Sequence, residues 1–189
     1  MKRRQMLKTC VAAATAAGIT STLTPTARAD RKTFAPIDSK KMVATALECF
    51  TTRGQTCPES ILSAGCQALG IESDLVPDIA LGLAGGVGLQ GRICGLLTAS
   101  AMVVSLAVAK KEKDYPKKKL QSLQITGRLF NKFAQQFGSC RCRLLCGLDL
   151  TTPEGREKLE KEVKLQVCTR YVRQATESLA RELMTLKSL

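Results

Sequence analysis

One long stretch without a charge, Ile93–Ala109, limits the fold more than any other feature of the chain. A helix formed by these 17 residues would be uncharged on every side, so it must be surrounded either by lipid or by other protein segments. A membrane span needs about 20 apolar residues, and this run includes Gly95, Ser100 and Ser105 among several alanines. These residues favour a central helix that neighbouring helices bury.

The other segments also show helical signals. After Asp38, apolar residues recur at about one turn, and a glycine follows most of the expected helix ends. Helices are expected at 38–53, 56–69, from 77, at 120–137 and from 151 to about 186, with a charged turn at 110–119 around Pro116. We see no strand-like alternation and no internal repeat. We therefore expect an all-α fold: a single compact domain, residues 38–189, of six or seven helices around the apolar helix at about 93–109.

The N-terminus has the order of a secretory signal. A basic head is followed by an uncharged stretch and by the small-residue site Ala27-Arg28-Ala29. The adjacent Arg3 and Arg4 are typical of the twin-arginine export pathway, which carries folded proteins. We expect residues 1–29 to be a twin-arginine signal peptide, residues 30–37 to be a linker, and the mature protein to be periplasmic or otherwise extracytoplasmic. Contact with a membrane is expected only if the signal is retained.

The composition of the mature chain narrows the range of possible functions. Removing residues 1–29 leaves 24 basic and 16 acidic residues, a net charge of +8 that could steer an acidic redox partner protein. Nucleic acid is a poor partner because the whole chain has seven aromatic residues for base stacking. Histidine is absent, which excludes an imidazole general base, histidine-ligated zinc or haem, and the haem c attachment sequence.

Eight cysteines follow the signal segment, and they are the main candidates for chemistry. An even number in an exported chain suggests disulfides, but this chain is longer and richer in core residues than small disulfide scaffolds are. Cys140, Cys142 and Cys146 form the densest group. On a helix Cys142 and Cys146 share one face, and the neighbouring Arg141 and Arg143 are expected to lower the pKa values of the thiols. Cys49 and Cys66 are interpreted as small buried hydrophobic residues.

A glycine-rich loop precedes the apolar helix. Residues 86–91 spell G-x-G-x-x-G, but no strand precedes the motif, so no nucleotide is expected. The glycines would let backbone amides surround an anionic group such as a cluster. The loop also brings Cys94 to a helix N-terminus, where its thiolate would be stabilised. Close packing of helices is the alternative reason for the glycines.

The order of these pieces resembles the C_GCAxxG_C_C family of redox proteins, which also occurs as a domain of split-Soret cytochromes. The resemblance covers roughly residues 44–185, and it rests on G-x-x-C-x-x-x-I at 54–61, on GGVGLQGRICG, on FGSCRCRLLCGLDLTTPEGREK and on a late cysteine. The family core reads Cys-Gly-Ala-x-x-Gly, whereas this chain has Leu96 and Ala99 at the third and sixth positions. The haem-binding part of the cytochromes has no counterpart.

The resemblance implies redox or metal chemistry at four signature cysteines, which fall on Cys57, Cys94, Cys142 and Cys168. Four such thiolates could hold an iron–sulfur cluster for electron transfer, and folded export favours this reading over disulfides. Cys140 and Cys146 are additional candidate ligands. A thiol–disulfide oxidoreductase is the alternative, followed by a partner-binding module stabilised by disulfides or zinc. The resemblance names no substrate, and it leaves open whether the protein is an enzyme and whether a homodimer shares the ligands.

Overall fold

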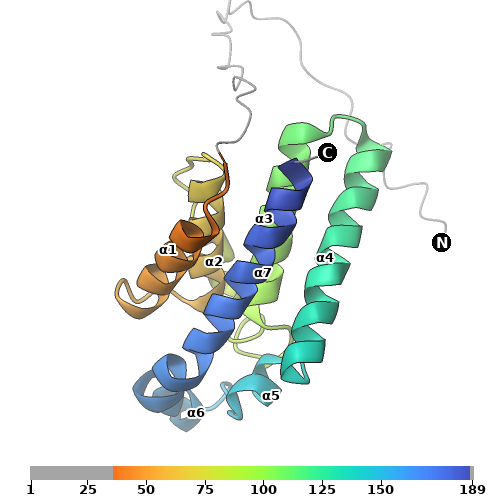
Figure 1. Ribbon diagram of the computed structural model, residues 1–189. Coiled ribbons are helices and arrows are strands. Elements are labelled where there is room, and N and C mark those ends of the chain that lie inside the picture. The colour runs from red at the N-terminus through yellow and green to blue at the C-terminus, as the bar shows by residue number, and fades with distance from the viewer. Residues whose placement is uncertain (1–35, 188–189) are drawn as a thin grey trace, which may run out of the picture. The chain divides into compact units, whose positions relative to one another are not determined.

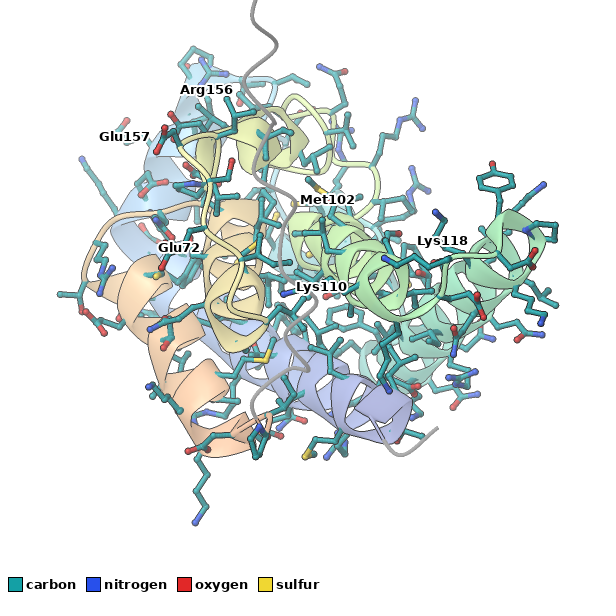
Figure 2. The ribbon with its side chains drawn as sticks, turned by 90° about the horizontal axis from the view of Figure 1, so that it is seen from above. Glu72, Met102, Lys110, Lys118, Arg156 and Glu157 are labelled. Atoms are coloured by element: carbon teal, nitrogen blue, oxygen red, sulfur yellow. The ribbon has the colours of Figure 1, made fainter. Side chains whose placement is uncertain are left out.

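Helix α3, Gly95–Lys111, lies at the centre of the computed structural model, which describes residues 36–187. It packs against α2 (Cys57–Ala68), α4 (Tyr115–Phe137) and α7 (Thr169–Lys187), as Figures 1 and 2 show. Nine residues of α3 are buried on a broad face of the helix, whereas Ser105 is exposed. The predicted central helix is therefore confirmed. In the described part of the chain, no helix has the length and apolar character needed to cross a membrane.

The remaining elements complete an all-α fold. Helix α1 spans Ser39–Thr51, α5 spans Cys142–Cys146 and α6 spans Pro153–Lys158. A 3₁₀ helix, η1, covers Asp78–Leu83, and a π-helix, η2, covers Leu159–Cys168. Residues 36–187 thus contain seven α-helices and no β-strand, in one compact unit, as the sequence predicts. The predicted signal peptide, 1–29, and the linker up to residue 35 lie outside the described residues.

Local sequence explains where most helices begin. The Asp38 carboxylate accepts a hydrogen bond from the Lys41 amide at 3.0 Å, and the Thr152 hydroxyl accepts one from the Gly155 amide at 3.0 Å. Each side chain therefore caps the helix that follows it. Helix α4 begins at Tyr115 rather than near residue 120, because Asp114 caps it and Pro116 occupies its first turn. The predicted charged turn at 110–119 is therefore shorter than expected, with Glu112–Asp114 between α3 and α4.

Small residues allow the helices around α3 to approach closely. A Cβ atom at Gly65 of α2 would overlap the Val103 side chain of α3. On the other side, Phe137 of α4 packs edge-on against Tyr171 of α7, with ring centroids 4.8 Å apart. The Tyr171 hydroxyl donates a hydrogen bond to the Leu145 carbonyl at 3.2 Å. These contacts hold α5 against the end of the bundle, near the N-terminus of α3 (Figure 1).

Candidate cysteine redox site

The glycine-rich loop forms a left-handed turn before α3. Five consecutive residues, 85–89, have positive φ angles, and two of them are not glycine: Val87 at 65° and Leu89 at 66°. Backbone hydrogen bonds close the turn, with the Val87 amide donating to Leu83 at 3.1 Å and the Leu89 amide donating to Ala84 at 3.1 Å. A β-branched residue such as Val87 rarely adopts this conformation, so the turn stores backbone strain.

This loop docks on the segment that carries the densest cysteine group. The Cys94 amide donates to the Cys140 carbonyl at 2.8 Å, and the Cys142 amide donates to the Arg92 carbonyl at 2.7 Å. An isolated antiparallel bridge joins the two segments between these bonds. Gly86 permits the contact, because a Cβ atom there would lie 2.8 Å from the Cβ of Cys142. The docking places Cys94 opposite Cys140 and Arg92 opposite Cys142.

The amides of residues 87–92 are occupied within the loop, because each donates to a carbonyl of the chain. These six amides are therefore not available to an anionic group, whereas close docking explains the glycine at position 86. Cys94 is the N-cap of α3, as predicted, but burial raises the pKa of its thiol to about 12. The Leu96 amide donates to the Cys94 sulfur and favours the thiolate, but burial has the larger effect.

Cys57 is the first residue of α2, next to the N-terminus of α3. The capping box of Thr56 and Glu59 starts the helix, with the Thr56 amide donating to a Glu59 oxygen at 2.9 Å. Gly95 of α3 allows α2 to approach, because a Cβ atom at this position would lie 2.6 Å from Cδ of Pro58. The small residue after Cys94 thus brings Cys57 and Cys94 together.

Cys168 ends the π-helix η2 and lies beside Cys57. The Cys57 thiol donates a hydrogen bond to the Cys168 sulfur, which raises the pKa of Cys57 well above its ordinary value. The same hydrogen bond lowers the pKa of Cys168 against the opposing effect of burial. Cys168 is therefore the more easily ionised thiol of the pair.

Cys142 and Cys146 form a second pair of this kind on α5. The Cys142 thiol donates to the Cys146 sulfur, which lowers the pKa of Cys146 to about 6. The Leu148 amide and the charge of Arg143 act in the same direction. The pKa of Cys142 is raised by the shared hydrogen bond and by burial. The prediction that neighbouring arginines lower both pKa values is therefore wrong for Cys142, because its thiol is the donor.

The structure brings the four signature cysteines together. Every pair among them interacts electrostatically, although they come from four separate segments. Of the two additional candidates, Cys146 interacts with Cys94, Cys142 and Cys168, whereas Cys140 interacts with Cys94. By contrast, Cys49 and Cys66 are each 1% exposed, and no other cysteine shifts their pKa values. The eight cysteines of the described part are free thiols.

The four thiols can be compared with the donors that a metal centre needs. Among residues 36–187, no three Cys, Asp or Glu side chains form a group that could hold one metal ion. In a four-iron cluster each thiolate binds its own iron atom, so the sulfurs surround a larger body than one ion. Four thiols in mutual electrostatic contact match that donor set in kind.

The site reaches solvent at its edge. Cys57 and Cys142 are half-buried, whereas Cys94, Cys146 and Cys168 are buried. Arg92 and Arg141 are exposed on the segments that carry Cys94 and Cys142. The sequence contains no signal for the π-helix or for the left-handed turn, because Val87 and Leu89 are residues that seldom adopt positive φ. The partnership of Cys142 and Cys146 was visible in their spacing, but the hydrogen bond between their sulfurs was not.

Comparison with curated proteins and with solved structures finds no match. A family model does match, over residues 55–182, and its description is "Putative redox-active protein (C_GCAxxG_C_C)". The matched range covers about two thirds of the chain, and it includes the four signature cysteines and the glycine-rich loop. The chain therefore belongs to the C_GCAxxG_C_C family of redox-active proteins.

Proposed function

We propose that this protein is an exported electron-transfer protein that holds an iron–sulfur cluster through Cys57, Cys94, Cys142 and Cys168. The observation that supports the proposal is that these four thiols lie close enough for every pair of them to interact electrostatically. No other cysteine of the described part interacts with all four. The absence of histidine also suits a site made of thiolates.

When bound, the cluster would supply a centre that accepts and releases single electrons. The protein residues have separate tasks around it. Cys168 is closest to the thiolate form before a metal binds, whereas Cys57, Cys94 and Cys142 hold protons that binding must release. The N-terminus of α3, where Gly95 and Leu96 are buried, excludes water from the back of the site.

The export segment belongs to the same proposal. Twin-arginine transport of residues 1–29 would follow folding in the cytoplasm, where a cluster can be inserted before the protein reaches the periplasm. The proposal includes a relation between this chain and the domain of split-Soret cytochromes. The haem sites of those cytochromes have no counterpart in this chain. Replacement of Arg3 and Arg4 by lysine should leave the uncleaved protein in the cytoplasm, and fractionation with N-terminal sequencing measures this. Export of the variant at the normal level would contradict the twin-arginine assignment.

The cluster is tested by purifying the protein without oxygen from cells that assemble clusters. We expect a brown protein with a charge-transfer band in its visible spectrum and with iron and sulfide in equal amounts. The Cys94→Ser variant should lose its iron and colour, whereas Cys66→Ser should keep both, since Cys66 lies outside the site. A colourless, iron-free wild-type protein would overturn the proposal, and equal effects of the two variants would show that the ligands are wrong. If the protein lacks iron, free thiols should then be counted before and after reduction. An increase on reduction would show that the cysteines form disulfides.

A further inference from the structure

Helix α5 carries two cysteines, Cys142 and Cys146. Only Cys142 is a signature cysteine and a proposed ligand of the four-ligand site. The two sulfurs are in hydrogen-bonding contact, one helical turn apart on the same face. Cys146 has no hydrogen bond to Cys57, Cys94 or Cys168, and apart from Cys142 its sulfur bonds only to the backbone of its own segment, including the Leu148 carbonyl at 3.9 Å.

The exposure of the two residues differs in a way that suits thiol–disulfide exchange. Cys142 is half-buried at the edge of the site. Cys146 is 8% exposed. An incoming disulfide would therefore meet Cys142 first, and Cys146 would be the nearest thiol able to complete the reaction.

The backbone of α5 allows the two sulfurs to approach further. Residues four apart on a helix have Cα atoms about 6 Å apart, within the range that disulfides tolerate. The helix has five residues, and it ends at Gly147, which has a φ of 71° and no atom within 4 Å of a Cβ placed there. Leu144 is 64% exposed, so a local adjustment of α5 disturbs little packing.

We propose that Cys142 and Cys146 form a reversible disulfide, which is a second redox couple inside the same site. The oxidant is a disulfide, either of a small thiol or of a partner protein. The Cys142 sulfur attacks one of its sulfur atoms while its proton passes along the shared hydrogen bond to Cys146, and one thiol is released. The Cys146 sulfur then attacks the mixed disulfide, gives up its proton to the leaving sulfur and releases the second thiol. The pair loses two electrons and two protons, and the oxidant becomes two thiols.

This couple has a consequence for the proposed cluster, and here alone the inference rests on the proposed function. Cys142 cannot bind iron while its sulfur is bonded to Cys146. Oxidation of the pair would therefore withdraw one of the four ligands. The disulfide itself requires no iron, so its formation can be measured in protein with or without a cluster.

The chain offers a direct assay, because trypsin cleaves after Arg141 and Arg143 and so separates Cys140, Cys142 and Cys146 into three peptides. The purified protein is equilibrated with buffers of varied reduced and oxidised glutathione, alkylated, digested and examined by mass spectrometry. We expect one two-electron transition that yields the peptide of residues 142–143 linked to that of residues 144–156. In iron-loaded protein, iron release should follow the same transition.

Two variants provide matched controls. In Cys146→Ser the linked peptides should be absent, and Cys142 should carry glutathione instead. In Cys140→Ser the link between Cys142 and Cys146 should form as in the wild type. Alkylation of both thiols in the most oxidising buffer, or a link from Cys142 to any other cysteine, would overturn the inference. If wild-type protein purified without oxygen from cells that assemble clusters lacked iron and still formed the link, the cluster would be refuted and this inference would stand.

Discussion

At the scale of single residues, the site is organised by two sulfur pairs, each joined by a hydrogen bond. In both pairs one thiol donates to its partner, so one pKa rises and the other falls. In the pair on α5, the hydrogen bond keeps Cys146 close to the thiolate form inside a largely buried site. The chain has no histidine, so few other groups titrate between pH 6 and pH 9.

The stability of reduced, metal-free protein should therefore rise with pH through this window. The pKa of Cys146 is about 6 in the folded state against an ordinary value of 9.0, so between these values the unfolded chain holds a proton that the folded protein has released. The free energy of unfolding should increase by at most about 1.4 kcal/mol per pH unit for each such pair. It should decrease above pH 9, where Cys94 stays protonated while the unfolded thiol ionises.

Urea unfolding at a series of pH values between 6 and 10 measures this dependence. The double variant Cys142→Ser, Cys146→Ser is the control, because it removes one pair and leaves Cys57 with Cys168 unchanged. Its slope between pH 6 and pH 9 should be smaller than that of the wild type. Identical slopes in the two proteins would show that the hydrogen bond between the two sulfurs does not shift their pKa values as described.

A buried carboxylate gives a second prediction at this scale, below pH 5. Burial alone would raise the pKa of Glu182, but hydrogen bonds from Arg128 at 2.7 Å and Lys132 at 3.0 Å outweigh it and lower the pKa. The Glu182→Gln variant should lose about 1–2 kcal/mol of unfolding free energy at neutral pH. The difference from the wild type should shrink as the pH falls below 4.5, because Glu182 then becomes protonated.

Thermal or urea unfolding at pH 7 and pH 3 measures both effects. Glu48→Gln is the matched control, since Glu48 also pairs with an arginine, Arg53, but both side chains are more than half exposed. That variant should change the unfolding free energy by less than about 0.5 kcal/mol. If the two variants behaved alike, the contact between α4 and α7 would contribute nothing beyond a surface ion pair.

At the scale of elements, the left-handed turn at 85–89 decides how α5 meets the N-terminus of α3. Gly86 and Gly88 both need positive φ, at 74° and 57°, but they differ in their surroundings. A Cβ atom at Gly86 would lie 2.6 Å from the Arg92 nitrogen and 2.8 Å from Cβ of Cys142, whereas Gly88 has no neighbour within 4 Å. Replacing Gly86 and Gly88 one at a time therefore distinguishes the effect of backbone strain from the effect of the contact with Cys142.

Gly88→Ala should destabilise the protein by about 1–2 kcal/mol, which is the strain of a left-handed alanine. Gly86→Ala should cost more, because the loop must also move away from α5. It should increase the alkylation rate of Cys142 in reduced protein, whereas Gly88→Ala should leave that rate unchanged. Urea unfolding and timed alkylation with mass spectrometry measure the two quantities. Equal alkylation rates in both variants would mean that the loop does not cover the site.

At the scale of the whole molecule, the positive charge of the chain continues to the edge of the site. Arg92 and Arg141 are exposed there, and neither has an ion pair among the described residues, whereas Arg143 pairs with Asp149 at 2.6 Å. We propose that an acidic redox partner approaches this edge. Attraction by exposed charges weakens with salt over a screening length of about 10 Å at 0.1 M ionic strength.

Hexacyanoferrate(III), an anionic oxidant, should therefore oxidise the reduced protein more slowly as salt increases, whereas a cationic cobalt(III) complex should not. The double variant Arg92→Gln, Arg141→Gln should slow the anionic oxidant several-fold at low salt. Lys119→Gln is the control, because Lys119 is exposed near the far end of α4 (Figure 1). Stopped-flow spectroscopy gives the rates. An equal loss for the control, after allowing for the number of charges removed, would show that only the net charge matters.

The helical part of the fold could be predicted from the sequence because its signals are local. Capping residues such as Asp38 and Thr152, and glycine stops such as Gly138, act within one turn of the chain. The uncharged run at 93–109 required burial by neighbours, which is why its central place followed from the sequence. The start of α4 was missed because Pro116, which suggested a turn, occupies the first turn of a helix.

The identity of the candidate cysteines also came from the sequence, through their order and spacing and through the family pattern. Their relation to one another did not, because it depends on contacts between segments far apart in the chain. The thiol of Cys94 shows the difference: a helix N-terminus favours its thiolate, but the burial that tertiary packing imposes raises its pKa to about 12. Local sequence thus determined the helices and the reactive atoms, whereas only the tertiary structure decided which sulfurs meet and which of them hold the protons.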